Sequence, residues 1–438
     1  MAKKAASTIF SRITDAYLIL VATVYLLYIG CSGFAGITGE KYHLFLLLCG
    51  GYAAIMLLLL AENATVSAKH IQLRAALENT SWTQRLIAVY LLLTWVSTLL
   101  SPYFPQTIFG VSRYEGALTI TIYCLCFFLV SAYGRISKPL IMAFATAVTL
   151  FALLCIVQLY GGNPFTLYPA GYCYADAGTA YSGAYLGTIG NVDLVAAFFC
   201  LAIPAFWATI LRSHEGKRYY LIVPLALSLF VLVKMDVLAG FVGVFGGAII
   251  SLVVIIPMEK RIRCYAAWGM LAAAVFAIIA LYCFDFGGMF YELHSILRGE
   301  ISGAFGSGRI HIWKQVLKSV PEHLLFGTGP DTMLYGGLEA FSRYDESLGG
   351  TIIGCIDVAH NEYLNILYHQ GIFALIAYLG ALFSAVKKWL TDSARSTRSA
   401  VLGTMLLCYG IQAFFSFSMV MTAPYFWLTL ALFDKRDM

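Results

Sequence analysis

The chain has 438 residues, of which 60% are hydrophobic and only 12% are charged. A soluble domain averages roughly 45–50% apolar and 25% charged residues, so this composition excludes a soluble globular protein and indicates burial in lipid. The net charge of +5 does not indicate a nucleic-acid partner, because the basic residues collect in short loops between apolar segments.

Apolar stretches of about 20 residues, the length that a helix needs to cross a bilayer core, recur along the whole chain. We therefore expect an all-α polytopic membrane protein of about twelve transmembrane helices, folded as a single integral-membrane domain over 1–438. The last stretch is short for a full crossing. The expected spans cover 16–34, 42–61, 84–101, 115–133, 138–160, 191–211, 218–233, 237–257, 264–284, 366–386, 399–417 and 423–433.

The positions of Lys and Arg predict the orientation. If the N-terminus is cytoplasmic and the spans alternate, 20 of the 28 Lys and Arg lie on the inner side. This excess follows the positive-inside rule, so both termini are expected in the cytoplasm. The first apolar run is long enough to span and no small-residue cleavage site follows it, which argues against a cleaved signal peptide.

Two long segments, 161–190 and 285–359, fall on the expected outer side, and the second lies before the last three spans. Loops longer than about 12–15 residues are usually functional or disordered, and the aromatic and aliphatic content here argues against disorder. The spacing of apolar residues in part of the larger loop predicts an amphipathic helix on the membrane surface, with Trp313 at the level of the lipid headgroups. Its apolar residues at helical spacing, before Pro321, are Ile310, Trp313, Val316, Leu317 and Val320.

Two outer arginines could bind an anion. Arg309 follows Gly306 and Gly308 and opens the predicted amphipathic helix. Its planar guanidinium suits a diphosphate through paired hydrogen bonds; the alternative is an interfacial arginine paired with a carboxylate or a lipid phosphate. Arg113 precedes an expected span, and its alternatives are a local pair with Glu115 or helix capping.

His360 is the candidate general base. It begins the run His360-Asn361-Glu362 at an expected helix start, with Asp357 upstream as a candidate cap. The positive end of a helix disfavours an imidazolium, so the ring is expected to be neutral and able to accept a proton. The alternative is a histidine that only forms interfacial hydrogen bonds. His369, deeper along the same helix, is expected to be structural.

The eleven cysteines show no metal-ligand spacing. Neither a metal site nor a cofactor is expected, because no nucleotide or zinc motif is present. Cys173 and Cys355 are the two clear outer cysteines, and both a disulfide between them and two free thiols remain open.

Several short motifs occur in a recognisable order. Arg309-x-x-x-Trp313 is followed by Phe326-Gly-Thr-Gly-Pro330, then by His360-Asn361-x-Tyr363-Leu364 and Gly371-Ile372; earlier in the chain stand Arg113-Tyr-Glu-Gly116 and Gly190-Asn-Val-Asp193. This order resembles the O-antigen ligase / O-antigen polymerase superfamily of integral-membrane glycosyltransferases. The resemblance covers most of the chain in topology, and its specific motifs lie between 309 and 372.

The resemblance implies a C-type glycosyltransferase-like fold in the bacterial cytoplasmic (inner) membrane. It implies transfer of a glycan from undecaprenyl diphosphate to a hydroxyl of a glycan, lipid or polymer acceptor, on the outer face of the membrane, with no cofactor and with membrane lipids as partners. His360 would be the base, and Arg309 would bind the diphosphate together with Lys234 or Arg113. These proteins often carry a second arginine in a Ser-Arg-Gly motif, for which the nearest segment here, 234–240, has only Lys234. Residues expected to support the acceptor or the site are Asp357, Asn361 and Trp313.

The alternative to an enzyme is a polysaccharide flippase or another transporter without catalytic activity. Such proteins tend to carry ionisable residues at mid-membrane and internal repeats. In this chain the notable charges lie at the expected outer boundary and no repeat is visible, which favours the enzyme. Whether it is a ligase or a polymerase depends on the acceptor, which the sequence leaves open.

Overall fold

A computed structural model describes residues 2–435 except 68–79, 168–173, 177–178, 182–186, 213–215, 236, 257, 288, 301, 303–304, 307, 346–349 and 394–395. Within these residues, nine helices are long and apolar enough to cross a membrane. The chain is therefore a multi-pass membrane protein. The described residues do not include Cys173, so its candidate disulfide with Cys355 lies outside them. They also do not include most of 62–83, the polar stretch between the second and third expected spans.

Helices make up nearly all of the described fold. In the first half they are α1 (Ala2–Leu20), α2 (Ile37–Phe45), α3 (Gly51–Ser67), α5 (Trp82–Leu100), α6 (Gln106–Phe109), α7 (Ala117–Tyr133), α8 (Lys138–Leu159) and α9 (Val192–Arg212). In the second half they are α10 (Ile222–Met235), α11 (Leu238–Phe241), α12 (Gly247–Ile255), α13 (Lys260–Cys283), α14 (Met289–Leu297), α15 (Arg309–Ser319), α16 (Glu362–Asp392), α17 (Thr397–Gln412) and α18 (Ala423–Asp434).

Three π-helical turns continue helices of this set. The turn Val21–Tyr25 extends α1, the turn Leu46–Gly50 joins α2 to α3, and the turn Val242–Gly246 joins α11 to α12. Side-chain caps fix several helix starts: Ser81 begins α5 with a capping box to Gln84, and Ser137 begins α8.

The first span differs from the expected one. It covers Thr8–Tyr25 rather than 16–34, because the helix stops before a turn in which Gly33 has a positive φ of 57°. Lys41 follows the first expected span, which places its charge on the outer side. Its side chain is buried and donates hydrogen bonds to the carbonyls of Tyr25 and Leu26. An ammonium at this helix end satisfies carbonyls that have no partner within the helix.

The eleventh expected span ends earlier than predicted, and the twelfth, 423–433, is as short as predicted. Helix α17 ends at Gln412 and α18 has only 12 residues, all of them buried. The connection between them, 413–422, is not helical yet contains the buried residues Phe417, Met419 and Val420. Non-helical backbone is tolerated at this depth only where protein surrounds it. The short α18 is thus a central helix of the bundle, packed on α7 and α17.

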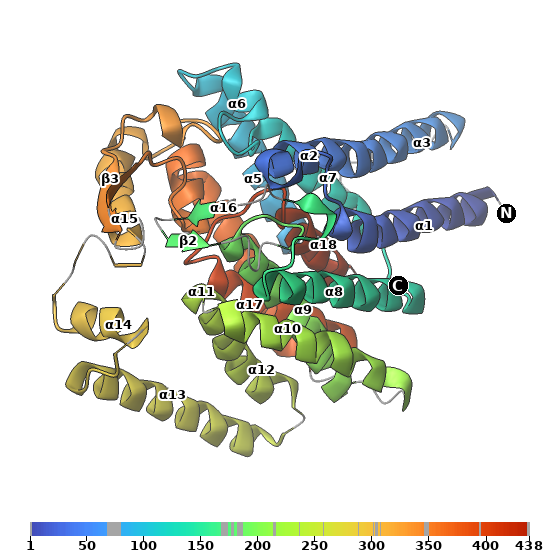
Figure 1. Ribbon diagram of the computed structural model, residues 1–438. Helices are drawn as coiled ribbons and strands as arrows, with labels where there is room; N and C mark the ends of the chain where they lie inside the picture. The colour runs from blue at the N-terminus through green and yellow to red at the C-terminus, as the bar shows by residue number, and fades with distance from the viewer. Residues whose placement is uncertain are drawn as a thin grey trace.

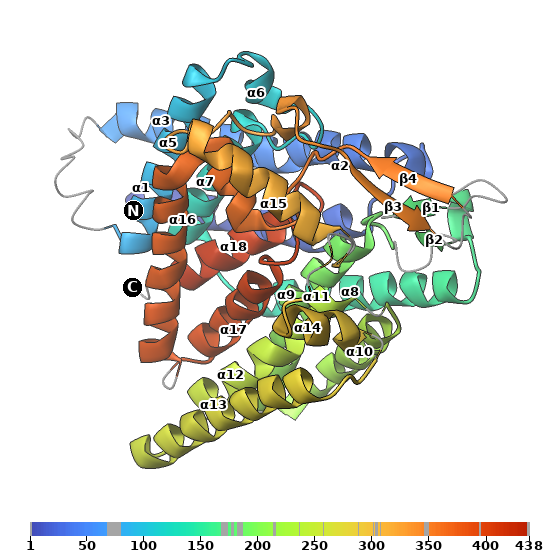
Figure 2. The same cartoon turned by 90° about the vertical axis from the view of Figure 1, so that its left-hand side faces the viewer.

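The two termini lie on the same side of the bundle (Figure 1). Helices α14 and α15 and strand β3 lie at the opposite end, which we call the distal end. Figure 2 shows α15 and the strands gathered over this end. The expected large loop 285–359 is therefore a folded layer over one end of the transmembrane helices.

The distal layer contains strands, which an all-α fold does not predict. Strands β3 (Phe341–Asp345) and β4 (Gly350–Gly354) form one antiparallel hairpin, and β1 (Tyr174–Asp176) and β2 (Thr179–Tyr181) form another. In each pair the strands are three or five residues long. These hairpins are additions to a helical bundle and do not change its class.

The predicted amphipathic helix exists as α15 and ends before Pro321, and one of its faces packs on protein. Its buried stripe is Ile312, Val316 and Val320, which pack against Ile356, Ala359 and Tyr368. Leu317, expected on the apolar face, is 51% exposed. Periodicity identified the helix, but the buried face is set by the protein layer beneath it.

Helix α16 bends sharply at Gly371. Its 31 residues would extend about 46 Å as a straight helix, more than a bilayer core of about 30 Å. Gly371 has φ 82° and separates a short distal helix from the membrane-crossing part. A Cβ at this position would lie 2.2 Å from the carbonyl oxygen of Leu325, so only glycine fits.

Candidate functional site

His360 lies at the distal end, directly before α16. Its φ is 48°, an uncommon conformation for a residue other than glycine. Asn361 caps the helix, because its Oδ1 accepts a hydrogen bond from the Leu364 N–H at 3.0 Å. Asn365 Oδ1 accepts from the N–H of Ala359 at 2.8 Å. The two amide side chains thus fix the backbone on both sides of the imidazole; Asp357, the expected cap, does not serve as one.

The His360 ring is neutral in this setting. Its side chain is 27% exposed, and the ring packs edge-on against Phe417 with 5.1 Å between centroids. Burial, then the charges of Arg309 and Arg113, lowers the pKa of His360 to about 3. The neutral imidazole agrees with expectation, but the cause is burial and two guanidiniums rather than the helix end.

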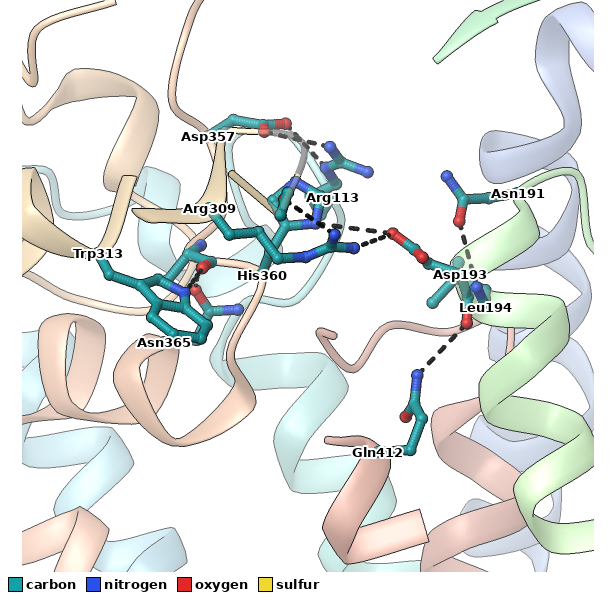
Figure 3. A network of polar contacts seen from close by, with 12 residues as sticks. Arg113, Asn191, Asp193, Leu194, Arg309, Trp313, Asp357, His360, Asn365 and Gln412 are labelled. Atoms are coloured by element: carbon teal, nitrogen blue, oxygen red, sulfur yellow. Dashed lines mark hydrogen bonds and ion pairs between the residues drawn. The ribbon is translucent and has the colours of Figure 1, made fainter. Parts of the chain in front are cut away.

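Arg309 begins α15 after Gly308, which has a φ of 87°. Its Nη1 donates to the carbonyl oxygen of Gly306 at 3.0 Å, and its Nη2 donates to Asp193 Oδ2 at 2.8 Å. Arg309 Nε is buried without a hydrogen-bond partner among the described residues. The positive φ of Gly308 lets the backbone turn so that the carbonyl oxygen of Gly306 accepts from the guanidinium, and Figure 3 shows the Arg309 side chain extended towards Asp193.

Arg113 is the second cation beside His360. Its Nε and Nη2 donate to the two carboxylate oxygens of Asp357 at 2.8 and 3.1 Å, and its guanidinium lies 5.0 Å from the centroid of the Phe417 ring. Asp331 holds the loop by accepting hydrogen bonds from the N–H groups of Ser112 and Arg113. Phe417 thus contacts both Arg113 and His360 and joins them into one site.

The local pair considered for Arg113 does not form as expected. Glu115 accepts a hydrogen bond from the hydroxyl of Tyr123 at 2.9 Å, whereas the carboxylate partner of Arg113 is Asp357, 244 residues further along the chain. The Arg113–Asp357 pair therefore ties the start of α7 to the segment that precedes His360.

Asp193 joins the site from α9 and was not among the expected site residues. Its Oδ2 lies 2.8 Å from Arg309 Nη2 and 3.9 Å from His360 Nδ1, and Figure 3 shows the carboxylate facing both from the start of α9. Asn191 accepts from the N–H of Leu194 at 3.2 Å, which orders the first turn of α9. Two signals in the sequence pointed to it: its place in the Gly190-Asn-Val-Asp193 motif, and an acidic residue in a first helical turn, which is common.

Lys234 is not part of this network. It lies exposed in the last turn of α10, and within the described residues no hydrogen bond or ion pair links it to Arg309 or His360. Of the two residues expected to provide the second positive charge, Arg113 is the one that the structure brings to His360.

Trp313 supports the site through the protein rather than the lipid. Its Nε1 donates to the carbonyl oxygen of Ala359 at 2.9 Å, and its ring packs against Phe414 and Phe415. The indole fastens α15 to the backbone next to His360.

A polar cavity of about 80 Å³ adjoins the site, with Arg113, Asp357 and Phe417 in its wall. Its wall also includes His369 and Gln370, and His369 Nε2 and Gln370 Oε1 are buried without hydrogen-bond partners among the described residues. A cavity with such unpartnered polar atoms is large enough to hold several water molecules. His369 thus lines the cavity next to the site instead of only packing within the helix.

Comparison with known proteins identifies the second half of the chain. Residues 223–379 match the model of a family described as O-antigen ligase. This stretch is therefore similar to O-antigen ligases. No curated protein matches the sequence. The superfamily resemblance drawn from the motifs is confirmed, and the family supports a glycan-transferring membrane enzyme.

The stretch that matches the family, 223–379, contributes only part of the site. Lys234, Arg309 and His360 lie inside the matched residues, whereas Arg113 and Asp193 lie before them. The site is therefore completed by two elements from the first half of the chain, the loop before α7 and the start of α9.

The glycines of the Phe326–Pro330 loop, which lies within the matched residues, shape the backbone behind the site. The N–H groups of Thr328 and Gly329 donate to the carbonyls of Tyr368 and His369 at 3.0 and 2.9 Å. A Cβ at Gly327 would lie 2.3 Å from the backbone of His369. The Phe326–Pro330 loop thus packs directly on the bend of α16 and holds the short helix that begins after His360.

Proposed function

We propose that this protein transfers a glycan from undecaprenyl diphosphate to an acceptor hydroxyl at the outer face of the cytoplasmic membrane. The observation that carries the proposal is a neutral imidazole, His360, set between two guanidiniums, those of Arg309 and Arg113, at the distal end. A neutral imidazole can take the proton of a hydroxyl, and guanidiniums bind and stabilise a diphosphate.

In this proposal His360 deprotonates the acceptor hydroxyl as its oxygen attacks the anomeric carbon of the donor. Arg309 and Arg113 hold the diphosphate and stabilise the charge that develops on it as the glycosidic bond breaks. Attack opposite the diphosphate inverts the anomeric centre. Lys234 remains at the periphery. The donor bond supplies its own free energy, so no nucleotide is needed.

Three residues position these groups without reacting. Asn361 caps the helix that follows His360, Trp313 anchors α15 to the backbone at Ala359, and Asp357 orients Arg113. Preorganised charges of this kind stabilise a transition state because they need not reorient during the reaction.

The proposal places the distal end outside the cell and both termini in the cytoplasm. Two facts support this orientation: the positive-inside excess of Lys and Arg, and the position of both termini on the side opposite the site. The acceptor is a glycan, lipid or polymer that presents a hydroxyl at that surface, and membrane lipids surround the enzyme.

The test is transfer by purified protein reconstituted with a polyprenyl-diphosphate-linked glycan and candidate acceptors. General-base help contributes about 10²–10⁴ in rate, so His360→Ala should lose transfer by that factor while the protein still inserts. His311→Ala is the matched control, because His311 lies on α15 and only contacts the backbone oxygen of Glu339. Full activity of His360→Ala, or loss of wild-type activity on chelation alone, would contradict the proposed base.

A further inference from the structure

One oxygen atom of Asp193 faces both candidate catalytic groups. Asp193 Oδ2 accepts a hydrogen bond from Arg309 Nη2 at 2.8 Å and lies 3.9 Å from Nδ1 of His360. The second distance is too long for a hydrogen bond, and Nδ1 is buried without a partner among the described residues. The carboxylate is therefore hydrogen-bonded to Arg309, and Nδ1 of His360 has no hydrogen-bond partner among the described residues.

The groups that face His360 come from every element around it. Arg309 approaches from α15, Arg113 from the loop before α7, Asp193 from α9, and Phe417 from the segment after α17. Two cations and burial together keep the ring neutral and lower its pKa to about 3. An imidazole with so low a pKa is a weak proton acceptor at neutral pH, since a base is most effective when its pKa is near the working pH.

We propose that Asp193 is a positioning residue that couples donor binding to activation of the base. In the free protein its carboxylate pairs with Arg309. When the donor's diphosphate takes over the guanidinium, the carboxylate is released and pairs with Nδ1 of His360. The inference rests on the function proposed above and adds the order of events: the donor binds before the histidine can act.

The physical reason is competition between two anions for one guanidinium. A diphosphate offers paired oxygens to the planar fork and carries more charge than a carboxylate, so it displaces Asp193. Its negative charge also offsets the two cations that disfavour an imidazolium. Both changes raise the pKa of His360 towards neutrality, because an opposite charge within about 4–6 Å favours the protonated ring.

The chemical step then balances as follows. Nδ1–H of His360 donates to Asp193, which leaves Nε2 as the proton acceptor. Nε2 takes the proton of the acceptor hydroxyl while that oxygen forms a bond to the anomeric carbon. The bond from the anomeric carbon to the diphosphate oxygen breaks, and its electron pair stays on the diphosphate. The imidazolium paired with Asp193 later releases its proton to water.

The variant Asp193→Asn tests this inference because it keeps the shape of the side chain and removes its charge. In the reconstituted transfer assay we expect kcat to fall about 10- to 100-fold, and the acidic limb of the kcat–pH profile to move to lower pH by about one unit. The donor KM should not rise. Glu339→Gln is the control: this carboxylate on the distal surface accepts a hydrogen bond from Gln315 of α15, and its loss should change neither quantity.

A binding measurement without turnover provides the second readout. Farnesyl diphosphate, a short soluble polyprenyl diphosphate, should bind Asp193→Asn about fivefold more tightly than wild type, because no carboxylate competes for Arg309. Arg309→Ala should bind it more weakly than both.

The outcomes separate the inference from the proposed function. An unchanged kcat–pH profile in Asp193→Asn overturns the inference, and so does weaker binding of farnesyl diphosphate, which would reduce Asp193 to a support for the fold. Neither result touches the base role, which His360→Ala tests separately. If wild-type protein binds farnesyl diphosphate but transfers no glycan, it is the proposed function that fails.

Discussion

Arg309→Lys is the substitution that tests the diphosphate site most directly. It keeps a positive charge at the start of α15 and removes the planar fork. In the structure this fork donates two hydrogen bonds at once, to the carbonyl oxygen of Gly306 at 3.0 Å and to Asp193 at 2.8 Å. A single ammonium on a flexible stem cannot reproduce that geometry.

The size of the effect follows from the hydrogen bond that is lost. A hydrogen bond to a charged group contributes roughly 1.5–3 kcal/mol, and every 1.36 kcal/mol of transition-state stabilisation is a tenfold change in rate. Losing one of the two bonds that Arg309 would offer to a diphosphate should therefore lower kcat/KM roughly 10- to 150-fold. Arg309→Ala, which removes both bonds and the charge, should cost more.

The assay is initial-rate transfer by reconstituted enzyme at several donor concentrations, with membrane expression measured for each variant. Lys314→Arg is the matched control, because Lys314 lies exposed on the same helix and the reverse change should leave kcat/KM at the wild-type value. Wild-type transfer by Arg309→Lys would refute the reasoning and leave Arg309 as a surface anchor of α15.

Three further predictions follow from the fold and the charges. In a background without native cysteines, Glu322→Cys should react with a membrane-impermeant maleimide on intact cells and Lys387→Cys should not; the reverse pattern would invert the proposed topology. Gly371→Ala should reduce the yield of folded protein, since the added Cβ would lie 2.2 Å from the Leu325 carbonyl oxygen; a normal unfolding temperature would contradict the fixed bend of α16. The pKa of His360 is lowered to about 3 in the folded protein, so between about pH 6.5 and 3 the unfolded chain binds a proton that the native one does not. The free energy of unfolding should therefore fall as the pH drops through this range. Thermal unfolding in detergent measures this decline, and His360→Asn should flatten it.

The membrane class and most helices could be predicted from the sequence, because a lipid-exposed helix needs a long apolar run whatever it packs against. All twelve expected spans correspond at least in part to described helices, although only nine have the length and apolarity of a membrane span. The failure concerns 413–422, where the eleventh span was expected to continue as a helix to 417. There the chain is as apolar as a lipid-facing helix but lies inside the protein, and composition does not separate the two environments.

The positions of two site residues could also be predicted locally. His360 precedes a helix start that Asn361 caps, and Arg309 begins a helix after glycines; both features depend on neighbours within a few residues. The same local reasoning made Asp357 a helix cap, which Asn361 is instead. This error arose because the true partner of Asp357, Arg113, is distant in sequence.

What only the tertiary structure decided is which groups share the site. Asp193 and Arg309 are 116 residues apart, and Arg113 and Asp357 are 244 apart, so no periodicity or motif connects them. Phe417 reaches His360 from a non-helical segment. The sequence by itself determined that the chain spans a membrane and where its helices begin, because those properties depend on local composition. The pairing of charges depends on how the helices pack, and an apolar surface gives the same signal in sequence whether it faces lipid or another helix.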